Sequence, residues 1–136
     1  MDSSPKKKPL SPAQLQSVAA LFRALCDPLR LAILQTLCEQ PRCVGEIVEH
    51  VGTSQANVSK HLRKLVSGAV LLPETRGRHV FYRLAHGLPL RLCELVHAEI
   101  ARLPRRRTAK LKNAAARKRP PRMSAATSAS GEISAT

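Results

Sequence analysis

Five segments of the chain carry apolar residues at the i, i+3 and i+4 spacing that gives a helix one apolar face. Ser11-Pro12 and Asp27-Pro28 each place a capping side chain directly before a proline, which is a typical helix start. Gly52 and Gly68 stand where two of the segments end, as expected at helix C-termini. The predicted helices cover approximately residues 11–25, 27–39, 43–50, 53–67 and 89–103.

Between the fourth and fifth of these helices, the pattern changes from helical spacing to alternation. Residues 70–74 and 79–84 are rich in β-branched, leucine and aromatic residues, and residues 75–78 between them are polar and include Gly77. Val80, Tyr82 and Leu84 alternate with His79, Phe81 and Arg83 along the second run. Two β-prone runs joined by a short glycine-containing turn predict a β-hairpin.

The segment 53–65 organises the other elements. Its apolar positions Val58, Leu62 and Leu65 form one helical face, and its other positions carry amides, hydroxyls and cations that suit a polyanion. Alone, the segment fits an ordinary amphipathic surface helix equally well. A short helix and a glycine-containing turn precede it, which is the helix–turn–helix layout. The hairpin tip that follows carries Arg76 and Arg78, as a DNA-binding wing would.

The charge of the chain also favours a nucleic-acid partner. The net charge is +14 and the isoelectric point is about 10.9, whereas aromatic residues make up only 2%. Low aromatic content disfavours the stacking platforms that bind RNA or single strands, and it leaves double-stranded DNA as the expected partner. Most of the charge lies in two segments that we expect to be disordered basic tails, residues 1–10 and 104–136. The single folded domain is then 11–103.

The expected cellular location of the protein determines whether its cysteines are reduced thiols or disulfides. No apolar run approaches the length of a membrane span, and the basic N-terminus is not followed by the apolar segment of a secretory signal. We therefore expect a cytoplasmic protein with reduced thiols. Its four cysteines are then first interpreted as small buried residues: Cys26, Cys38, Cys43 and Cys93.

Three segments together resemble one family. Residues 21–34 read LFRALCDPLRLAIL, residues 54–62 read SQANVSKHL, and the predicted wing ends in FYRL at 81–84. Over about residues 13–103, the chain closely resembles the arsenic-repressor (ArsR/SmtB) family of winged-helix transcriptional regulators. The resemblance implies a mainly α fold with a small β-hairpin, a winged helix–turn–helix. It also implies a homodimer, formed through the first and last helices, that binds an inverted-repeat operator and represses transcription.

The resemblance also assigns DNA-binding roles. Gln55 and Asn57 are the expected base readers, because side-chain amides pair with adenine edges. The expected phosphate and wing contacts are Ser54, Ser59, Lys60, His61, Arg63, Arg76 and Arg78. Five of these side chains, at positions 54, 55, 57, 60 and 61, are expected on the exposed N-terminal half of the recognition helix.

The metal sites of the family are incomplete in this chain. Cys43-Val44-Gly45 lacks the second thiolate of a Cys-x-Cys pair. His86 and His97 have the spacing of a site on the last helix, but Leu84 and Ile100 replace the other two ligands, and two ligands do not close a tetrahedral zinc site. We therefore expect no bound metal or cofactor.

Other thiol sites stay open as alternatives. Cys93 and His97 share one helical face, where packing is the favoured interpretation and metal ligation the alternative. A thiol site that senses arsenite or oxidants, using Cys38, Cys43 or Cys93, is also open, because the spacing selects no pair.

Two other classes of protein are alternatives to a sequence-specific repressor. A nucleoid-type protein would coat DNA through its basic tails without sequence preference, but it would not need the amide-bearing face of residues 53–65. An enzyme is disfavoured because the sequence has no glycine-rich phosphate loop and no pair of acids placed for a cleft.

Overall fold

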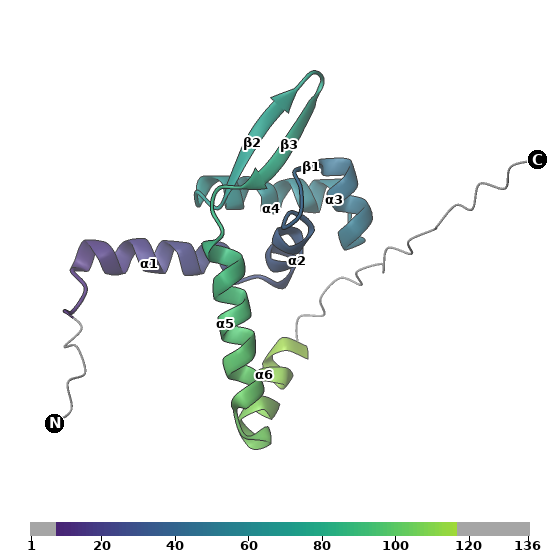
Figure 1. Ribbon diagram of the computed structural model, residues 1–136. Coiled ribbons are helices and arrows are strands. Elements are labelled where there is room, and N and C mark those ends of the chain that lie inside the picture. Colours follow the sequence, from purple (N-terminus) through teal and green to yellow (C-terminus); the bar gives the residue numbers. More distant parts are fainter. Residues whose placement is uncertain (1–7, 117–136) are drawn as a thin grey trace, which may run out of the picture.

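A computed structural model of the chain describes residues 8–116 (Figure 1). The elements of this part are, in chain order, α1 (Pro12–Leu25), α2 (Pro28–Thr36), β1 (Arg42–Cys43), α3 (Val44–Val51), α4 (Gln55–Ser67), β2 (Leu71–Arg76), β3 (His79–Leu84), α5 (Leu88–Arg102) and α6 (Arg105–Ala116). The mainly α winged helix–turn–helix predicted from the sequence is confirmed.

Local side-chain caps explain where the first two helices begin. The Ser11 hydroxyl accepts a hydrogen bond from the Gln14 N–H, while the Gln14 side chain accepts one from the Ser11 N–H, so the two residues form a capping box. The Asp27 carboxylate accepts from the N–H groups of Leu29 and Arg30 at the start of α2. Both predicted helix starts are therefore correct.

Helices α3 and α4 are joined by the tight turn of the helix–turn–helix. Gly52 ends α3 with a φ of 68°, a left-handed conformation that glycine adopts without steric cost. Ser54 then caps α4, because its hydroxyl accepts from the Asn57 N–H at 3.2 Å. This turn sets the direction in which α4 leaves the body of the protein.

Helix α4 ends at Gly68, as predicted, but another residue takes the left-handed conformation. Gly68 has an ordinary φ of −82°, and the left-handed residue is Ala69, with a φ of 56°. The Val70 N–H donates to the Leu65 carbonyl and the Ala69 N–H to the Val66 carbonyl, which together form a Schellman motif. Gly68 is required for space instead, because a Cβ there would lie 2.8 Å from the Ala24 Cβ.

The wing is a three-stranded antiparallel sheet in the order β1-β3-β2. Arg76 pairs with His79, so the hairpin turn consists of Gly77 and Arg78, with Gly77 at a φ of 61°. The third strand, β1, pairs Arg42 with Tyr82 and was not predicted from the sequence. Two residues are too few for a sequence pattern, and the pairing depends on the position of β3.

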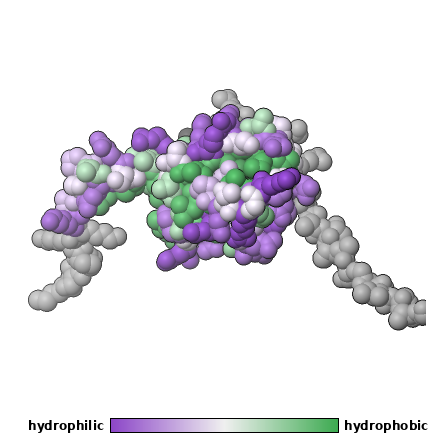
Figure 2. Space-filling view, turned by 90° about the horizontal axis from the view of Figure 1, so that it is seen from above, coloured by the Kyte–Doolittle hydropathy of each residue, from purple (hydrophilic) through white to green (hydrophobic). Residues whose placement is uncertain are grey.

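The core lies where α2, α3, α4 and the start of β2 meet. Its fully buried side chains come from these elements and the turn after α4: Ile33, Leu34, Ile47, Val51, Val58, Leu62, Leu65, Val70 and Leu71. Helices α1 and α5 project from this body (Figure 1) and keep large apolar residues exposed, among them Phe22 and Val96. Seen from above, the apolar surface continues from the body along the arm formed by α1 (Figure 2).

Helix α6 corrects the expectation that the chain is disordered from residue 104. The Thr108 N–H donates to the Pro104 carbonyl, and Thr108 and Lys112 line a pocket together with residues at the end of α5. Its residues are mostly Arg, Lys, Ala and Leu, which have high helix propensity, so the charge of the segment does not prevent a helix. The predicted tails over 1–7 and 117–136 lie outside the described residues.

No helix within residues 8–116 has both the length and the apolar character needed to cross a membrane.

Candidate nucleic-acid interface

Helix α4 turns one face to the core and the opposite face to solvent. Val58, His61, Leu62 and Leu65 are buried. The exposed positions include four of the predicted contacts, Ser54, Gln55, Lys60 and Arg63, and Ser59 is half-buried beside them. The structure thus brings five predicted DNA-binding residues together on one surface of the recognition helix and its cap.

The side chain of Asn57 has a fixed orientation at the edge of this surface. Its amide nitrogen donates to the Thr53 hydroxyl at 3.2 Å, and the residue is half-buried. This bond leaves the amide oxygen and the second amide hydrogen for a base edge. A base contact by Asn57 would therefore use a side chain that the turn has already oriented.

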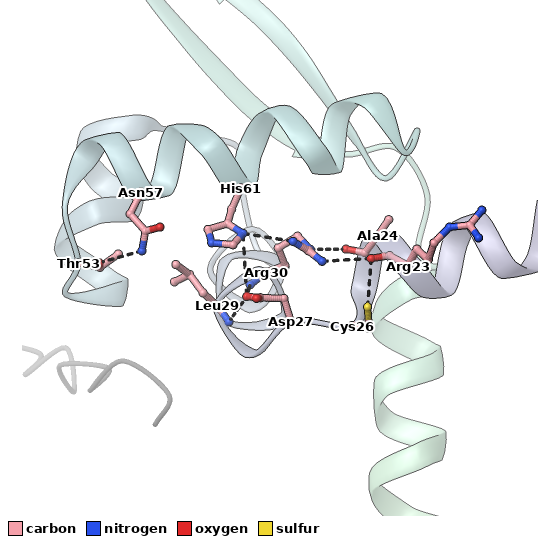
Figure 3. A network of polar contacts seen from close by, with 9 residues as sticks. All are labelled: Arg23, Ala24, Cys26, Asp27, Leu29, Arg30, Thr53, Asn57 and His61. Atoms are coloured by element: carbon pink, nitrogen blue, oxygen red, sulfur yellow. Dashed lines mark hydrogen bonds and ion pairs between the residues drawn. The ribbon is translucent and has the colours of Figure 1, made fainter. Parts of the chain in front are cut away.

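His61 is not on the exposed face, contrary to the expectation for the recognition helix. It is 7% exposed and faces the junction of α1 and α2 (Figure 3). Its helical position explains this, because it lies three residues after Val58 and four before Leu65 on the buried face. The structure thus places His61 on the buried face of α4, away from the surface that carries the other predicted contacts of this helix.

Arg30 is the buried partner of His61 and was given no role from the sequence. It is 7% exposed, and its Nη1 lies 3.3 Å from His61 Nδ1. Its Nε donates to the Ala24 carbonyl at 2.6 Å and its Nη2 to the Arg23 carbonyl at 3.1 Å (Figure 3). A cation within an otherwise apolar run, residues 29–34, was the available signal, because a buried cation needs partners.

The charges around this contact shift two pKa values. Burial lowers the pKa of His61, Asp27 raises it, and Arg30, Lys60 and Lys64 lower it further, so the net shift is downward. Burial raises the pKa of Asp27, but the N–H groups of Arg30 and Leu29 and the positive charges of His61 and Arg30 outweigh burial and lower it. The network therefore favours a neutral imidazole beside a charged carboxylate.

The wing holds its two predicted arginines in different ways. Arg76 donates to both oxygens of the Glu74 carboxylate at 3.3 Å and lies 5.0 Å from the centre of the Phe81 ring. The hydrogen bond from Arg76 lowers the pKa of Glu74. Arg78, in the turn, is exposed and has no hydrogen bond or ion pair within the part of the chain that the structure describes. Within the described residues, the guanidinium of Arg78 thus keeps its donors free, whereas that of Arg76 does not.

Two of the candidate ligands, Cys93 and His97, lie on α5, away from this surface. A cavity of about 360 Å³ between α1, α2 and α5 is lined by Cys26, Cys93 and His97 among apolar side chains. Burial and the Glu94 carboxylate raise the pKa of the Cys93 thiol, which disfavours the thiolate that binds metals. Within residues 8–116, no three His, Cys, Asp or Glu side chains are grouped so that they could hold a metal ion.

Comparison with known proteins supports the geometry. The sequence model described as "Bacterial regulatory protein, arsR family" matches residues 27–67. The HTH-type transcriptional regulator CmtR of Mycobacterium bovis is 37% identical over 86 residues, which are 62% of this chain and 73% of that protein. The chain belongs to the arsR family. The resemblance identified from the three sequence segments is therefore confirmed.

One further relative and one solved structure show how much of the chain is covered by the similarity. The HTH-type transcriptional repressor SmtB of Mycobacterium tuberculosis is 44% identical over 71 residues, which are 52% of this chain and 53% of that protein. The chain thus aligns with about half the length of this relative. The homodimeric winged helix–turn–helix DNA-binding domain of Mb0332 from Mycobacterium bovis superimposes with a TM-score of 0.58 at 31% identity, covering 72% of this chain and 88% of that one.

Proposed function

We propose that the protein is a sequence-specific double-stranded DNA-binding transcriptional regulator that acts in the cytoplasm as a homodimeric repressor. The observation that carries the proposal is the exposed face of α4, where amide, hydroxyl and cationic side chains lie on one surface beside a wing with the exposed Arg78. Gln55 and Asn57 would read base edges, and Ser54, Ser59, Lys60 and Arg63 would contact phosphates. Arg78, with Arg76, would hold the backbone or the minor groove.

The homodimer is proposed from the apolar faces of α1 and α5. Leu15, Val18 and Phe22 on α1 and Leu95 and Val96 on α5 are exposed within one copy of the chain. Pairing of these faces across a two-fold axis would remove them from water and place two recognition helices at successive major grooves. An inverted-repeat operator follows from that symmetry, and the homodimeric relative supports it.

The decisive experiment is competition binding to the DNA upstream of the coding sequence. The full chain is bound to this labelled duplex at moderate salt and challenged with unlabelled upstream DNA or with a scrambled duplex. A repressor is displaced by the upstream DNA at much lower concentrations, because specific binding exceeds non-specific binding by about a thousandfold or more. Equal displacement by both competitors would overturn the proposal and leave the nucleoid-type alternative.

Release by an effector is tested in the same assay. Zn(II), arsenite and an oxidant are added separately to the preformed complex. Release by any of them would direct mutagenesis to the candidate ligands Cys43, His86, Cys93 and His97. If the complex persists with all three, the sensor alternatives are rejected and the protein binds constitutively or responds to a partner.

A further inference from the structure

The last turn of α1 is held by groups that belong to the next helix. Three carbonyls at this end have no acceptor role within α1, and each receives a hydrogen bond from another segment. The Leu25 carbonyl accepts from the Asp27 N–H at 2.8 Å, the Ala24 carbonyl from Arg30 Nε, and the Arg23 carbonyl from both Arg30 Nη2 and the Cys26 thiol. Arg30 thus places a cation at the negative end of the α1 dipole and fixes the angle between α1 and α2.

The remaining nitrogen of the Arg30 guanidinium, Nη1, contacts His61 on the recognition helix. A guanidinium only donates, so a hydrogen bond at this 3.3 Å contact requires the Nδ1 atom of His61 to be the acceptor and to carry no proton. Asp27 Oδ1 lies 4.0 Å from the same Nδ1 atom. A proton on Nδ1 would place two donors against each other and would direct the ring toward Asp27 instead of Arg30.

We propose that Arg30 and the neutral His61 are positioning residues for DNA recognition, which set the placement of α4 relative to α1. The inference rests on the proposed function, in which α1 pairs with its counterpart in the dimer. Arg30 contacts both the end of α1 and His61 of α4, and this link between the two helices then sets the spacing and angle of the two recognition helices over the operator. Neither side chain contacts DNA, because both are buried inside one copy of the chain.

The contact between Arg30 and His61 is expected to weaken in acid. The charged groups that act on His61 are Asp27 and Arg30 from α2 and Lys60 and Lys64 from α4. Once His61 is protonated, it is repelled by Arg30 and both lysines and is attracted only by Asp27. Specific DNA binding should therefore fall as the pH decreases below the ordinary histidine range, while binding to arbitrary DNA should not fall with it.

The test compares two substitutions of His61 in the full chain. His61→Asn keeps an acceptor near the position of Nδ1 but does not titrate, and His61→Leu removes the acceptor. Arg30→Lys keeps the charge but cannot make the three contacts. His50→Asn is the matched control, because His50 Nδ1 bonds to the Glu46 carbonyl of its own helix, at 2.7 Å, and to no other helix within the described residues. Each protein binds an operator selected from random duplexes by the wild type, and a scrambled duplex, at about pH 8 and about pH 5.5.

All measurements are made at a temperature where circular dichroism shows each variant folded. We expect His61→Leu and Arg30→Lys to lose operator affinity by about tenfold or more, with scrambled-duplex affinity unchanged, which a change in stability alone would not produce. His61→Asn should bind like the wild type at pH 8 and, unlike the wild type, keep that affinity in acid.

The outcomes separate this inference from the proposed function. If the folded His61→Leu and Arg30→Lys proteins keep the operator preference of the wild type, the positioning role is wrong. Loss of operator affinity in acid by His61→Asn and the wild type alike would also overturn it. If the wild type itself shows no preference for a selected duplex, the proposed function fails, independently of His61.

Discussion

Gly68, at the end of α4, lies so close to Ala24, near the end of α1, that a Cβ on Gly68 would be 2.8 Å from the Ala24 Cβ. Both atoms would belong to backbone-fixed positions, so neither could move without shifting a helix. We expect Gly68→Ala to lower the free energy of unfolding by about 1–3 kcal/mol, as overpacking typically does. Urea denaturation followed by circular dichroism measures this.

Two further variants identify space as the cause. Adding Ala24→Gly to Gly68→Ala removes the clash and should recover part of the lost stability, beyond the sum of the two single effects. Ala69→Gly, at the adjacent left-handed residue, should be neutral or stabilising by up to about 1 kcal/mol. A strictly additive double variant would show that the contact between α1 and α4 is not tight.

Substitutions of Ser54 can distinguish its capping of α4 from its predicted contact with DNA. Ser54→Ala removes the acceptor for the Asn57 N–H and should cost about 1 kcal/mol of stability. Ser54→Asp keeps a good cap, so stability should be retained, but its negative charge would face the phosphates. Its affinity for any duplex should therefore fall more than that of Ser54→Ala. The reverse order in a shift assay would remove Ser54 from the DNA-facing surface.

The helix–turn–helix could be predicted from the sequence because its signals are local. The caps at Ser11, Asp27 and Ser54, the left-handed Gly52 and the apolar spacing of α4 each act within a few residues of the chain. The two longer strands were predictable for the same reason, since alternation and a glycine turn are read over one short segment. These local signals fix the order of the elements, from which the family resemblance followed.

The features that sequence reasoning missed depend on contacts between distant segments. His61 is polar, so it was expected on the exposed face of α4. Its buried partner, Arg30, lies 31 residues earlier in the chain, and no pattern within α4 indicates that contact. Strand β1 exists only because β3 lies beside Arg42 and Cys43. Helix α6 was missed because its charge run was interpreted as disorder, although arginine, lysine and alanine are good helix formers.

The wing arginines should differ in their contribution to DNA binding. Arg78 has no partner within the described residues, so Arg78→Ala should weaken binding and reduce the slope of log K against log salt by about one. Arg76 already pairs with Glu74, so Arg76→Ala should change that slope less. Glu74→Gln should strengthen binding, because it releases Arg76. Salt titrations of duplex binding test all three, and equal slopes for the two alanine variants would contradict the assignment.

Stability should depend on pH through His61 in a defined direction. Burial is the largest cause that lowers the pKa of His61 in the folded protein, so the unfolded chain binds a proton first as the pH falls. Its contribution is therefore complete above the ordinary histidine pKa of about 6.5 and is lost progressively below it. Asp27, with its lowered pKa, contributes fully above the ordinary carboxyl range and loses this contribution only at lower pH.

Denaturation midpoints between about pH 8 and about pH 5 measure the His61 contribution. The midpoint of the wild type should fall across this range, and that of His61→Asn should fall less, while His50→Asn should follow the wild type. Parallel curves for all three proteins would show that His61 is not the group responsible. The effect on folding would then have to be assigned to another histidine.

The proposed dimer is tested on α5, at Val96. This side chain is 45% exposed in one copy and lines the apolar cavity between α1, α2 and α5 together with Phe22, which is 51% exposed. Val96→Glu would bury an unpaired carboxylate in the dimer, so self-association should weaken by about a hundredfold or more, while the fold of each copy is retained.

Leu72→Glu is the control, because Leu72 is 40% exposed but lies on the wing. Sedimentation should show a monomer for Val96→Glu and a dimer for Leu72→Glu and the wild type. Dimers in all three proteins would show that this face of α5 is not the interface.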